Sequence, residues 1–170
     1  MTHHSSVDST TKILETIPDA HQILSKYFTP KSEDLSLWMN STYERNMNHP
    51  EALVHKGISG NLLRSKSEAM IDMALSTNQI PFRYEQALKL GESTIYPDFT
   101  IRHPETDKIY YWEHFGMMDN PSYIKNATAK IQLYTSNGII PSMNLIITSE
   151  TSSHPLNAED IKKTIEHYFG

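Results

Sequence analysis

Cysteine is absent from this sequence of 170 residues, which excludes disulfide bonds, thiolate zinc sites and a cysteine nucleophile. A chain without thiols suits a reducing compartment, so we expect a cytoplasmic protein. The sequence also lacks an apolar run long enough to span a bilayer, and its polar residues 1–6 lack the hydrophobic segment of a secretory signal. We therefore expect no membrane partner.

Three common kinds of catalytic or binding site are missing as well. The glycines at positions 57 and 60 are too close together to form a loop that cradles phosphates. No G-x-S-x-G sequence of a serine hydrolase is present. The nine histidines include no pair four residues apart on one helical face, so a zinc hydrolase is a weak alternative.

Positive charge is scarce, because 15 lysines and arginines face 20 acidic residues and the formal net charge is −5. A protein that coats nucleic acid through a broad basic surface would usually be positive. An enzyme needs only a local basic rim and bound cations, so the negative net charge counts less against an enzyme that acts on nucleic acid. Apolar residues make up 38% and charged residues 21% of the chain, which is typical of a soluble globular domain with a core.

The chain divides into three predicted regions. Residues 1–11 are rich in Ser, Thr and His, and we expect a disordered tail. Residues 12–61 are expected to form an N-terminal helical extension, and residues 62–170 a core. Within the extension the pattern predicts helices over 12–28 and 33–46, followed by a connector over 47–61.

The core has a clearer pattern of elements. From residue 62 onward the chain predicts the order helix, three strands, helix, strand and helix, which is an α/β fold. Asn120 and Pro121 form a cap and first turn for the second of these helices, and Gly138 is expected to stop it. The expected elements are a helix over 65–77, strands over 82–90, 95–102 and 108–115, a helix over 121–137, a strand over 143–148 and a helix over 157–169.

Two acidic residues lie on neighbouring strands of this core. Residues 104–107 are a good turn sequence, and a hairpin symmetric about that turn pairs Ile101 with Tyr110. The same register places Asp98 opposite Glu113, and directly opposed residues have Cβ atoms about 5 Å apart. Two like charges so placed repel each other, so the arrangement favours a cation between them.

Mg²⁺ or Mn²⁺ is the cation that we expect at Asp98 and Glu113, since Mg²⁺ prefers oxygen ligands and commonly binds one or two carboxylates plus waters and a substrate phosphate. The alternative is that one carboxylate simply faces solvent on an edge strand. Aromatic neighbours on both strands favour partial burial.

Glu68 is a third acidic candidate, and its position in the sequence has two interpretations. With Ser65 it forms a capping-box pattern at the start of a helix. It also shares a helical stripe with Ile71 and Leu75, which must pack on the sheet, so the side chain is drawn toward the end of the sheet. There it could approach the two strand carboxylates directly or through water.

These residues resemble the PD-(D/E)XK nuclease superfamily, which includes many restriction endonucleases and junction resolvases. Pro97-Asp98 matches the PD element, Glu113 the acidic residue of the second half-motif, and Glu68 the acidic residue of the first core helix. The strings Arg-Ser-Lys-Ser-Glu, Tyr-Pro-Asp-Phe-Thr and Tyr-Trp-Glu-His-Phe-Gly are similar to those of small uncharacterised bacterial and phage proteins of this superfamily. The resemblance covers about residues 64–150 and implies a restriction-endonuclease-like α-β-β-β-α-β core, with a mixed central sheet flanked by helices.

The sequence departs from the family at one position. The family pattern has Lys two residues after the Glu, where this chain has Phe115. Lys130, one helical turn before Tyr134, is our first candidate to replace it, and Lys66 on the first helix is the second. The alternative for either residue is a solvated surface lysine. The resemblance also implies that the backbone carbonyl of His114 can bind the metal, whereas its imidazole is expected to pack or hydrogen-bond.

The resemblance therefore implies a Mg²⁺-dependent nuclease that hydrolyses phosphodiester bonds, with DNA rather than RNA as the expected substrate, and leaves open whether it is an endonuclease or an exonuclease. The alternative is a catalytically inactive nuclease-fold protein that binds nucleic acid or a protein partner. The sequence leaves open whether the chain forms a homodimer. The catalytic candidates are Glu68, Asp98, Glu113, Lys130 and Lys66; the metal ligands are Asp98, Glu113, Glu68 and His114; and the nucleic-acid contacts are Arg64, Lys66, Lys125, Lys130 and Tyr134, with Arg83 as a further phosphate contact.

Overall fold

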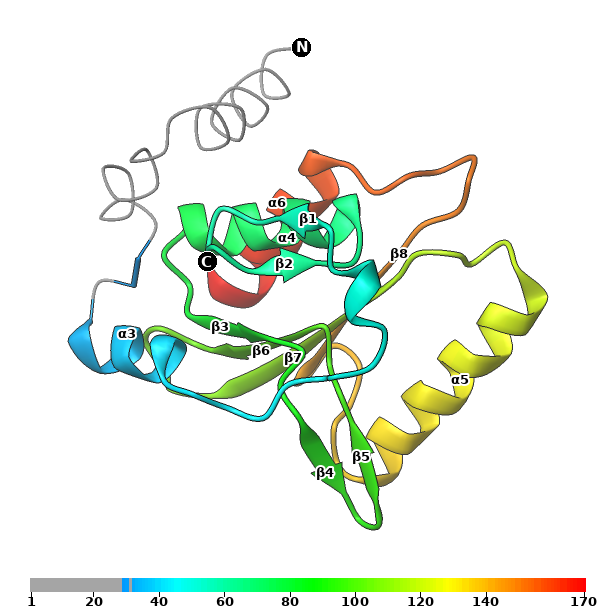
Figure 1. Cartoon of the computed structure of the whole chain (residues 1–170), viewed down its shortest axis with the longest axis horizontal. Helices are drawn as coiled ribbons and strands as arrows, with labels where there is room; N and C mark the ends of the chain where they lie inside the picture. The colour runs from blue at the N-terminus through cyan, green and yellow to red at the C-terminus, as the bar shows by residue number, and fades with distance from the viewer. Residues whose placement is uncertain (1–28, 31) are drawn as a thin grey trace. The chain divides into compact units, whose positions relative to one another are not determined.

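The computed structural model describes residues 29–30 and 32–170 (Figure 1). The chain divides into two compact units, which we describe separately. The first comprises the described residues up to Asn40 together with His49–Pro81 and Asn157–Gly170, and the second comprises Ser41–Asn48 and Phe82–Leu156. Over the described residues the fold is mixed α/β, with four α-helices and a mixed central sheet of four strands. In that part of the chain, no helix combines the length and apolar character needed to cross a membrane.

The first unit contains most of the helices. Ser65 caps α4 by accepting a hydrogen bond from the backbone N–H of Glu68, and Asn157 caps α6 in the same way. These two helices pack together, and their buried side chains include Ile71 and Ile161. The elements of this unit are α3 (Glu33–Asn40), the 3-10 helix η1 (Pro50–Ala52), β1 (His55–Lys56), β2 (Leu62–Leu63), α4 (Lys66–Thr77) and α6 (Ala158–Phe169).

The second unit holds the central sheet. Its strands lie in the order β3-β6-β7-β8, and only the pairing of β7 with β8 is parallel. The sheet is therefore mixed, as predicted. A separate two-stranded antiparallel ribbon is formed by β4 and β5. The elements are β3 (Phe82–Tyr84), β4 (Leu88–Leu90), β5 (Ser93–Ile95), β6 (Phe99–Arg102), β7 (Ile109–Phe115), α5 (Pro121–Ser136) and β8 (Leu145–Ser149).

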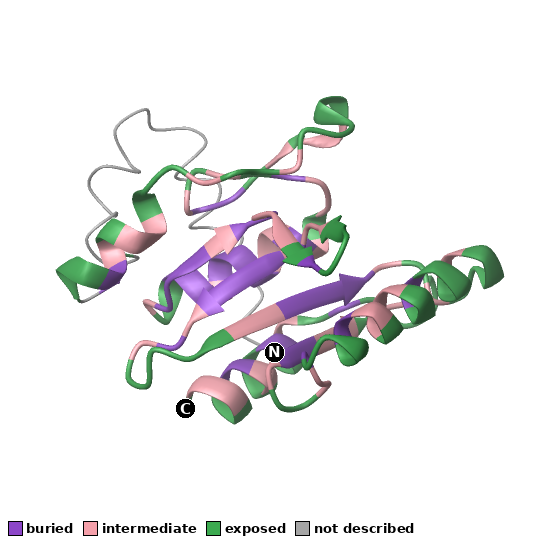
Figure 2. Cartoon of the chain, turned by 90° about the horizontal axis from the view of Figure 1, so that it is seen from below, coloured by how far each residue is buried: buried purple, intermediate pink, exposed green. Residues whose placement is uncertain are grey.

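The two faces of this sheet have different surroundings. One face carries an aromatic layer in which the ring of Phe99 contacts those of Tyr84 and Trp112. The other face carries Tyr111, which packs against Tyr134 of α5 in an apolar cluster with Leu145. Because side chains alternate along a strand, Thr100 and Glu113 share the face of Tyr111. Figure 2 shows α5, the long helix on the right, with a thin buried strip and a largely exposed outer side.

Both ends of α5 match the sequence prediction. Asn120 accepts a hydrogen bond from the backbone N–H of Tyr123, and Pro121 occupies the first turn, where its missing N–H costs nothing. The helix ends at Ser136, and Gly138 adopts a left-handed φ of 78° that a side chain would disfavour. The predicted helix at 65–77 and the final helix are likewise confirmed within a residue or two.

Three predicted elements are wrong in extent. The strand expected over 82–90 is split, because Glu85 takes a left-handed φ of 49° that turns the chain out of the sheet after Tyr84. The strand expected over 95–102 is also split, into β5 and β6, at residues 96–98, where Pro97 has no N–H for a ladder. The helix expected over 33–46 ends at Asn40.

The shortened helix has a clear local cause. After Asn40 the chain extends, and the hydroxyl of Tyr43 hydrogen-bonds both backbone groups of Tyr84. Asn46 donates to the carbonyl of Glu85, which continues the pairing beside the sheet. These contacts favour an extended segment over further helix. The predicted tail at 1–11 and the predicted helix at 12–28 lie outside the described residues.

Candidate functional site

The β6–β7 hairpin has the predicted register. Ile101 pairs with Tyr110, and Phe99 pairs with Trp112. Continuing this register by one step sets Asp98 opposite Glu113, although the ladder itself ends at Phe99. Glu113 is buried, with 2% of its surface exposed. The hairpin therefore brings both carboxylates to one end of β6.

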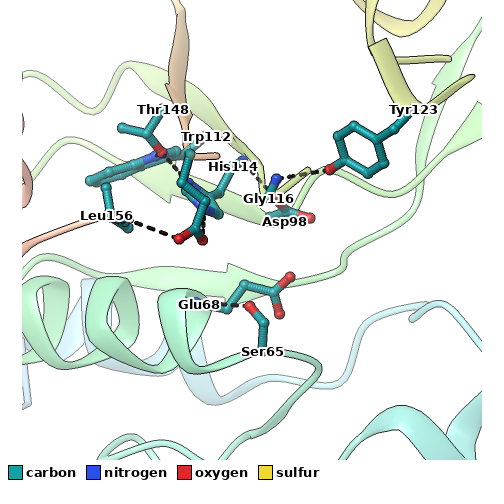
Figure 3. Close-up of polar contacts among 10 residues, drawn as sticks. Ser65, Glu68, Asp98, Trp112, His114, Gly116, Tyr123, Thr148 and Leu156 are labelled. Atoms are coloured by element: carbon teal, nitrogen blue, oxygen red, sulfur yellow. Dashed lines mark hydrogen bonds and ion pairs between the residues drawn. The ribbon is translucent and has the colours of Figure 1, made fainter. Parts of the chain in front are cut away.

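Asp98 is held by the backbone of the neighbouring strand. The N–H of His114 donates to Oδ2 of Asp98 at 2.7 Å, in the position where a longer β6 would have supplied a carbonyl (Figure 3). The N–H and C=O of one strand residue point to the same side of the strand, so the His114 carbonyl points toward the same end of β6. The carbonyl of Asp98 accepts from the N–H of Glu85 at 3.1 Å, which fixes its backbone as well.

Two side chains of α5 converge on Glu113. The ammonium of Lys130 lies 2.6 Å from Oε1 of Glu113, and the hydroxyl of Tyr134 donates to the same oxygen at 2.6 Å. These residues are one helical turn apart, so they project from the same face of the helix. Ala127 is buried on that face as well.

Tyr123 completes this face of α5. Its hydroxyl accepts a hydrogen bond from the N–H of Gly116 at 3.0 Å (Figure 3). Its ring meets Phe115 edge-on, with the ring centroids 6.5 Å apart. Burial raises the pKa of Tyr123, and the charges of Asp98 and Glu113 raise it further against the opposing hydrogen bond of Gly116. The phenol is therefore close to both carboxylates and stays protonated near neutral pH.

The electrostatics of the cluster keep Lys130 charged. Burial lowers the pKa of Lys130, but the negative charges of Glu113 and Asp98 outweigh that effect, and the net shift is upward. The pKa of Tyr134 is raised by burial and by the same two carboxylates, so its hydroxyl remains a donor. A cationic amine and a phenol thus share Oε1 of Glu113 within the field of two acidic groups.

The imidazole of His114 lies on the opposite face from Glu113 and forms hydrogen bonds there. Its Nδ1 is 2.8 Å from Oγ1 of Thr148, and its Nε2 is 2.7 Å from Oε1 of Glu150. Trp112 donates its Nε1–H to the same Thr148 hydroxyl at 3.0 Å (Figure 3). Because the Trp112 N–H can only donate, the Thr148 hydroxyl accepts from it and can itself donate a hydrogen bond to Nδ1, so that Nε2–H donates to Glu150. The imidazole is occupied by these contacts.

The predicted residues of the first unit are held by local contacts. One oxygen of Glu68 accepts from the N–H of Arg64 at 3.1 Å, and its own N–H donates to Ser65, as in a helix cap (Figure 3). Arg64 donates to the carbonyl of His49, and Lys66 is exposed at the first position of α4. Because Glu68 belongs to a different unit from Asp98, its part in the site stays a prediction.

The remaining predicted contacts lie on and near α5. Lys125 is exposed on the outer side of that helix. Phe115, at the position where the family has lysine, is buried at 5% exposure. The structure thus brings together four of the predicted residues, namely Asp98, Glu113, Lys130 and Tyr134, with the backbone of His114 beside them.

The donor set fits a hard divalent cation of the Mg²⁺ type. Among residues 29–30 and 32–170 no three or more His, Cys, Asp or Glu side chains cluster as metal ligands. A metal here would therefore rest on two carboxylates, a backbone carbonyl, waters and a substrate phosphate. Mg²⁺ commonly binds in this way, with one or two protein carboxylates.

Sequence reasoning missed two residues that the structure places at or behind the cluster. Tyr123 had a usable signal, because residues 123, 127, 130 and 134 follow the spacing of one helical face. Glu150 had none, since it lies just past the end of β8 and reaches His114 only through the parallel pairing of β7 with β8.

The site must be interpreted from its own geometry. Two acidic residues, a partly buried lysine and two phenols are supplied by β7, α5 and the residue just before β6, all in one compact unit. No protein-family model, no curated protein and no solved structure matches this chain.

Proposed function

We propose that this chain is a metal-dependent nuclease of the PD-(D/E)XK type that hydrolyses phosphodiester bonds in DNA. The observation that carries the proposal is the meeting of Asp98 and Glu113, from adjacent strands, with Lys130 of α5. An acidic pair beside a partly buried ammonium is the donor set that metal-assisted phosphoryl chemistry needs.

The arrangement of elements supports the family assignment. In chain order the helices and central strands run α4, β3, β6, β7, α5 and β8, which is the α-β-β-β-α-β order implied by the resemblance. The β4–β5 ribbon is an insertion between the first two central strands. The sheet is mixed, as that fold requires.

Asp98 and Glu113 would hold Mg²⁺ or Mn²⁺, with the carbonyl of His114 as a further ligand. When bound, such an ion supplies an acidified water and neutralises charge on the phosphoryl oxygens. Tyr134 orients Glu113 through its hydrogen bond to Oε1, and the N–H of His114 orients Asp98.

Lys130 takes the part of the lysine that is missing at Phe115. Lys130 reaches the Glu113 carboxylate from α5. The lysine of the family pattern would approach the same carboxylate from its position two residues further along the strand. Because its pKa is raised, it stays cationic and can stabilise negative charge on the phosphoryl group or orient the attacking water. Lys66 remains the second candidate for this part.

A cleavage assay tests the proposal. We expect the chain to cut single-stranded, duplex or branched DNA in Mg²⁺ or Mn²⁺ and to be inactive in EDTA. Asp98→Asn and Glu113→Gln should abolish cleavage, and Lys130→Met should lower kcat by about a hundredfold or more. Lys108→Met removes an exposed lysine from the turn of the hairpin and is the matched control. Full activity of Asp98→Asn or Glu113→Gln would refute the assignment.

One observation favours a second candidate function. Phe115 is buried against Tyr123, so the family position for lysine is filled by a packed ring. A nuclease-fold protein that binds nucleic acid or a protein partner without cleaving would tolerate this change. Calorimetric titration with Mn²⁺ separates the two, because the inactive relative should bind the ion weakly and show no metal-dependent cleavage.

A further inference from the structure

Two arginines of the second unit are stacked on one tyrosine ring. The guanidinium carbon of Arg45 lies 4.5 Å from the ring centroid of Tyr43, and that of Arg83 lies 5.0 Å from it. Arg83 also donates to the hydroxyl of Ser41 at 2.6 Å. Both guanidiniums are therefore held within a few ångströms of one flat ring. We refer to Tyr43, Arg45 and Arg83 as the arginine–tyrosine cluster.

The cluster is fixed by backbone contacts. The Tyr43 hydroxyl donates to the carbonyl of Tyr84 and accepts from its N–H, both at 3.1 Å. On either side of Arg45, Asn46 donates to the carbonyl of Glu85 and Ala87 donates to the carbonyl of Glu44. The ring and the backbone of Arg45 are thus in place before any ligand arrives, which lowers the entropic cost of binding.

Arg83 lies on the same sheet face as the candidate catalytic residues. It pairs with Thr100 across β3 and β6, and Thr100 pairs with Tyr111 across β6 and β7. Paired residues share a face, so Arg83, Tyr111 and Glu113 project to the same side. Strands are about 4.8 Å apart, which puts the β3 backbone about 10 Å from that of β7.

That separation suits a nucleic-acid backbone. Successive phosphates of one DNA strand rise about 3.4 Å along the axis, so the cluster lies within about three nucleotide steps of Asp98 and Glu113. The chain as a whole carries a net charge of −5, whereas this cluster holds two guanidiniums around one ring, with the charge of Glu85 also acting on Tyr43. A guanidinium has five N–H donors in a planar fork, so Arg83 can keep its Ser41 contact while binding a phosphate oxygen.

We propose that Arg45 and Arg83, stacked on Tyr43, bind a phosphodiester of the DNA substrate a few nucleotides from the cleavage site. This inference rests on the proposed nuclease function, whose active site it extends along the sheet toward β3. Each guanidinium can supply charge-assisted N–H donors to the phosphate oxygens. The contact carries no base specificity, and it fixes the register of the strand on the sheet.

The test is DNA binding by fluorescence anisotropy in EDTA, where no cleavage occurs, at several salt concentrations. Each lost phosphate contact should reduce the slope of log K against log salt by about 0.7 to 0.9. We expect this shallower slope in Arg45→Gln and Arg83→Gln, and at least tenfold weaker binding when both are combined. Lys108→Gln, which removes one exposed positive charge at the other end of the β6–β7 hairpin, should keep the wild-type slope.

Conservative variants control for a loss of DNA binding that is caused by disturbed folding. Arg45→Lys and Arg83→Lys keep the charge but lose the fork, so they should keep the salt slope and weaken binding less than the glutamines do. Circular dichroism should match the wild type for every variant. Equal affinity and slope of the wild type and the double glutamine variant would overturn the inference.

The outcome separates this inference from the proposed function. If the wild type cleaves DNA but the arginine variants bind normally, only the inference fails. If binding depends on both arginines while no metal supports cleavage, the nuclease proposal fails and the cluster remains a phosphate site of an inactive relative. If the wild type binds no DNA at all, both are overturned.

Discussion

At the scale of single residues, the charge balance around Glu113 determines what the site can do. Its carboxylate is almost fully buried and shares one oxygen between Lys130 and Tyr134. An unpaired buried carboxylate is costly, so the ammonium compensates Glu113 when no divalent cation is present. Lys130 and a metal ion would then act on the same oxygen or its neighbour, and their effects on stability should be coupled.

Lys130→Met tests this coupling. Loss of the ammonium leaves a buried carboxylate without its cationic partner Lys130, and we expect the free energy of unfolding to fall by about 2 kcal/mol in EDTA. Mg²⁺ should restore part of that loss. The double variant Lys130→Met/Glu113→Gln should lose less stability than the sum of its two single variants. Urea unfolding with and without Mg²⁺ measures these values, and purely additive effects would contradict the coupling.

Asp72 gives a second prediction at this scale, in the first unit. The carboxyl is buried under residues 57–61, accepts bonds from the N–H and hydroxyl of Ser59, and leaves no room for a side chain at Gly57. Burial raises the pKa of Asp72 to about 6 against the opposing bonds of Ser59. The folded state therefore holds a proton that the unfolded state has released between about pH 4 and pH 6.

The direction of the pH dependence of stability follows from this difference in bound protons. Stability from Asp72 is fully present below about pH 4 and is lost as the pH rises through about 6, a change of about 3 kcal/mol. Asp72→Asn should remove that part of the pH dependence. Ser59→Ala should move the loss to higher pH, since its hydrogen bonds lower the pKa. Urea unfolding across this pH range checks both, and identical profiles for wild type and Asp72→Asn would contradict the assignment.

At the scale of elements, β7 carries different chemistry on its two faces. Glu113 faces α5, while Trp112 and His114 face a chain of hydrogen bonds through Thr148 to Glu150. Glu150 also accepts the N–H of Leu156, so this chain ties the end of β7 to the segment after β8. The N–H of His114 holds Asp98. The series of hydrogen bonds on one face of the sheet therefore supports the candidate site on the other face.

Thr148→Val should show this support. The valine keeps the shape but leaves the Trp112 N–H and one imidazole nitrogen without their partner, at a cost of about 2 kcal/mol. We also expect weaker Mg²⁺ binding by calorimetry, because the His114 backbone that holds Asp98 is less well fixed. Thr148→Ser keeps the hydroxyl and should restore both values. Wild-type Mg²⁺ affinity in Thr148→Val would show that these hydrogen bonds stabilise the fold but do not support metal binding.

Element ends were predictable where a side chain imposes them. Ser65, Asn120 and Gly138 mark the ends of α4 and α5 in the sequence as they do in the structure. The break at 96–98 also has a local cause in Pro97, whereas the break at Glu85 was not predictable in the same way. Glutamate has no preference for a left-handed φ, and the turn depends on pairing with residues 44–46, which are distant in sequence.

At the scale of the whole molecule, the candidate metal ligands Asp98 and Glu113 both belong to the second unit. The hairpin register and the position of Lys130 on its helix were readable from the sequence, since both follow local periodicity. The contact of Lys130 with Glu113 was not, because it depends on how α5 packs on the sheet. The Tyr43 contacts also escaped prediction, since their partner Tyr84 is 41 residues away.

The chain contains two tryptophans, and each unit holds one of them, Trp38 on α3 and Trp112 on β7. In Trp38→Phe the fluorescence of Trp112 reports the second unit alone. An ion that binds only the folded state stabilises it by about 2.7 kcal/mol when its concentration is a hundred times its Kd. Mg²⁺ should therefore raise the midpoint of the thermal unfolding that Trp112 fluorescence reports.

The shift should disappear in Trp38→Phe/Asp98→Asn and persist in Trp38→Phe/Glu85→Gln, which removes a buried acidic residue outside the proposed ligand set. Thermal unfolding followed by Trp112 emission, with Mg²⁺ and with EDTA, provides the comparison. A Mg²⁺ shift that survives Asp98→Asn would place the ion elsewhere on the chain. The proposed metal site requires Asp98 as well as Glu113, because the charge of Glu113 is already compensated by Lys130.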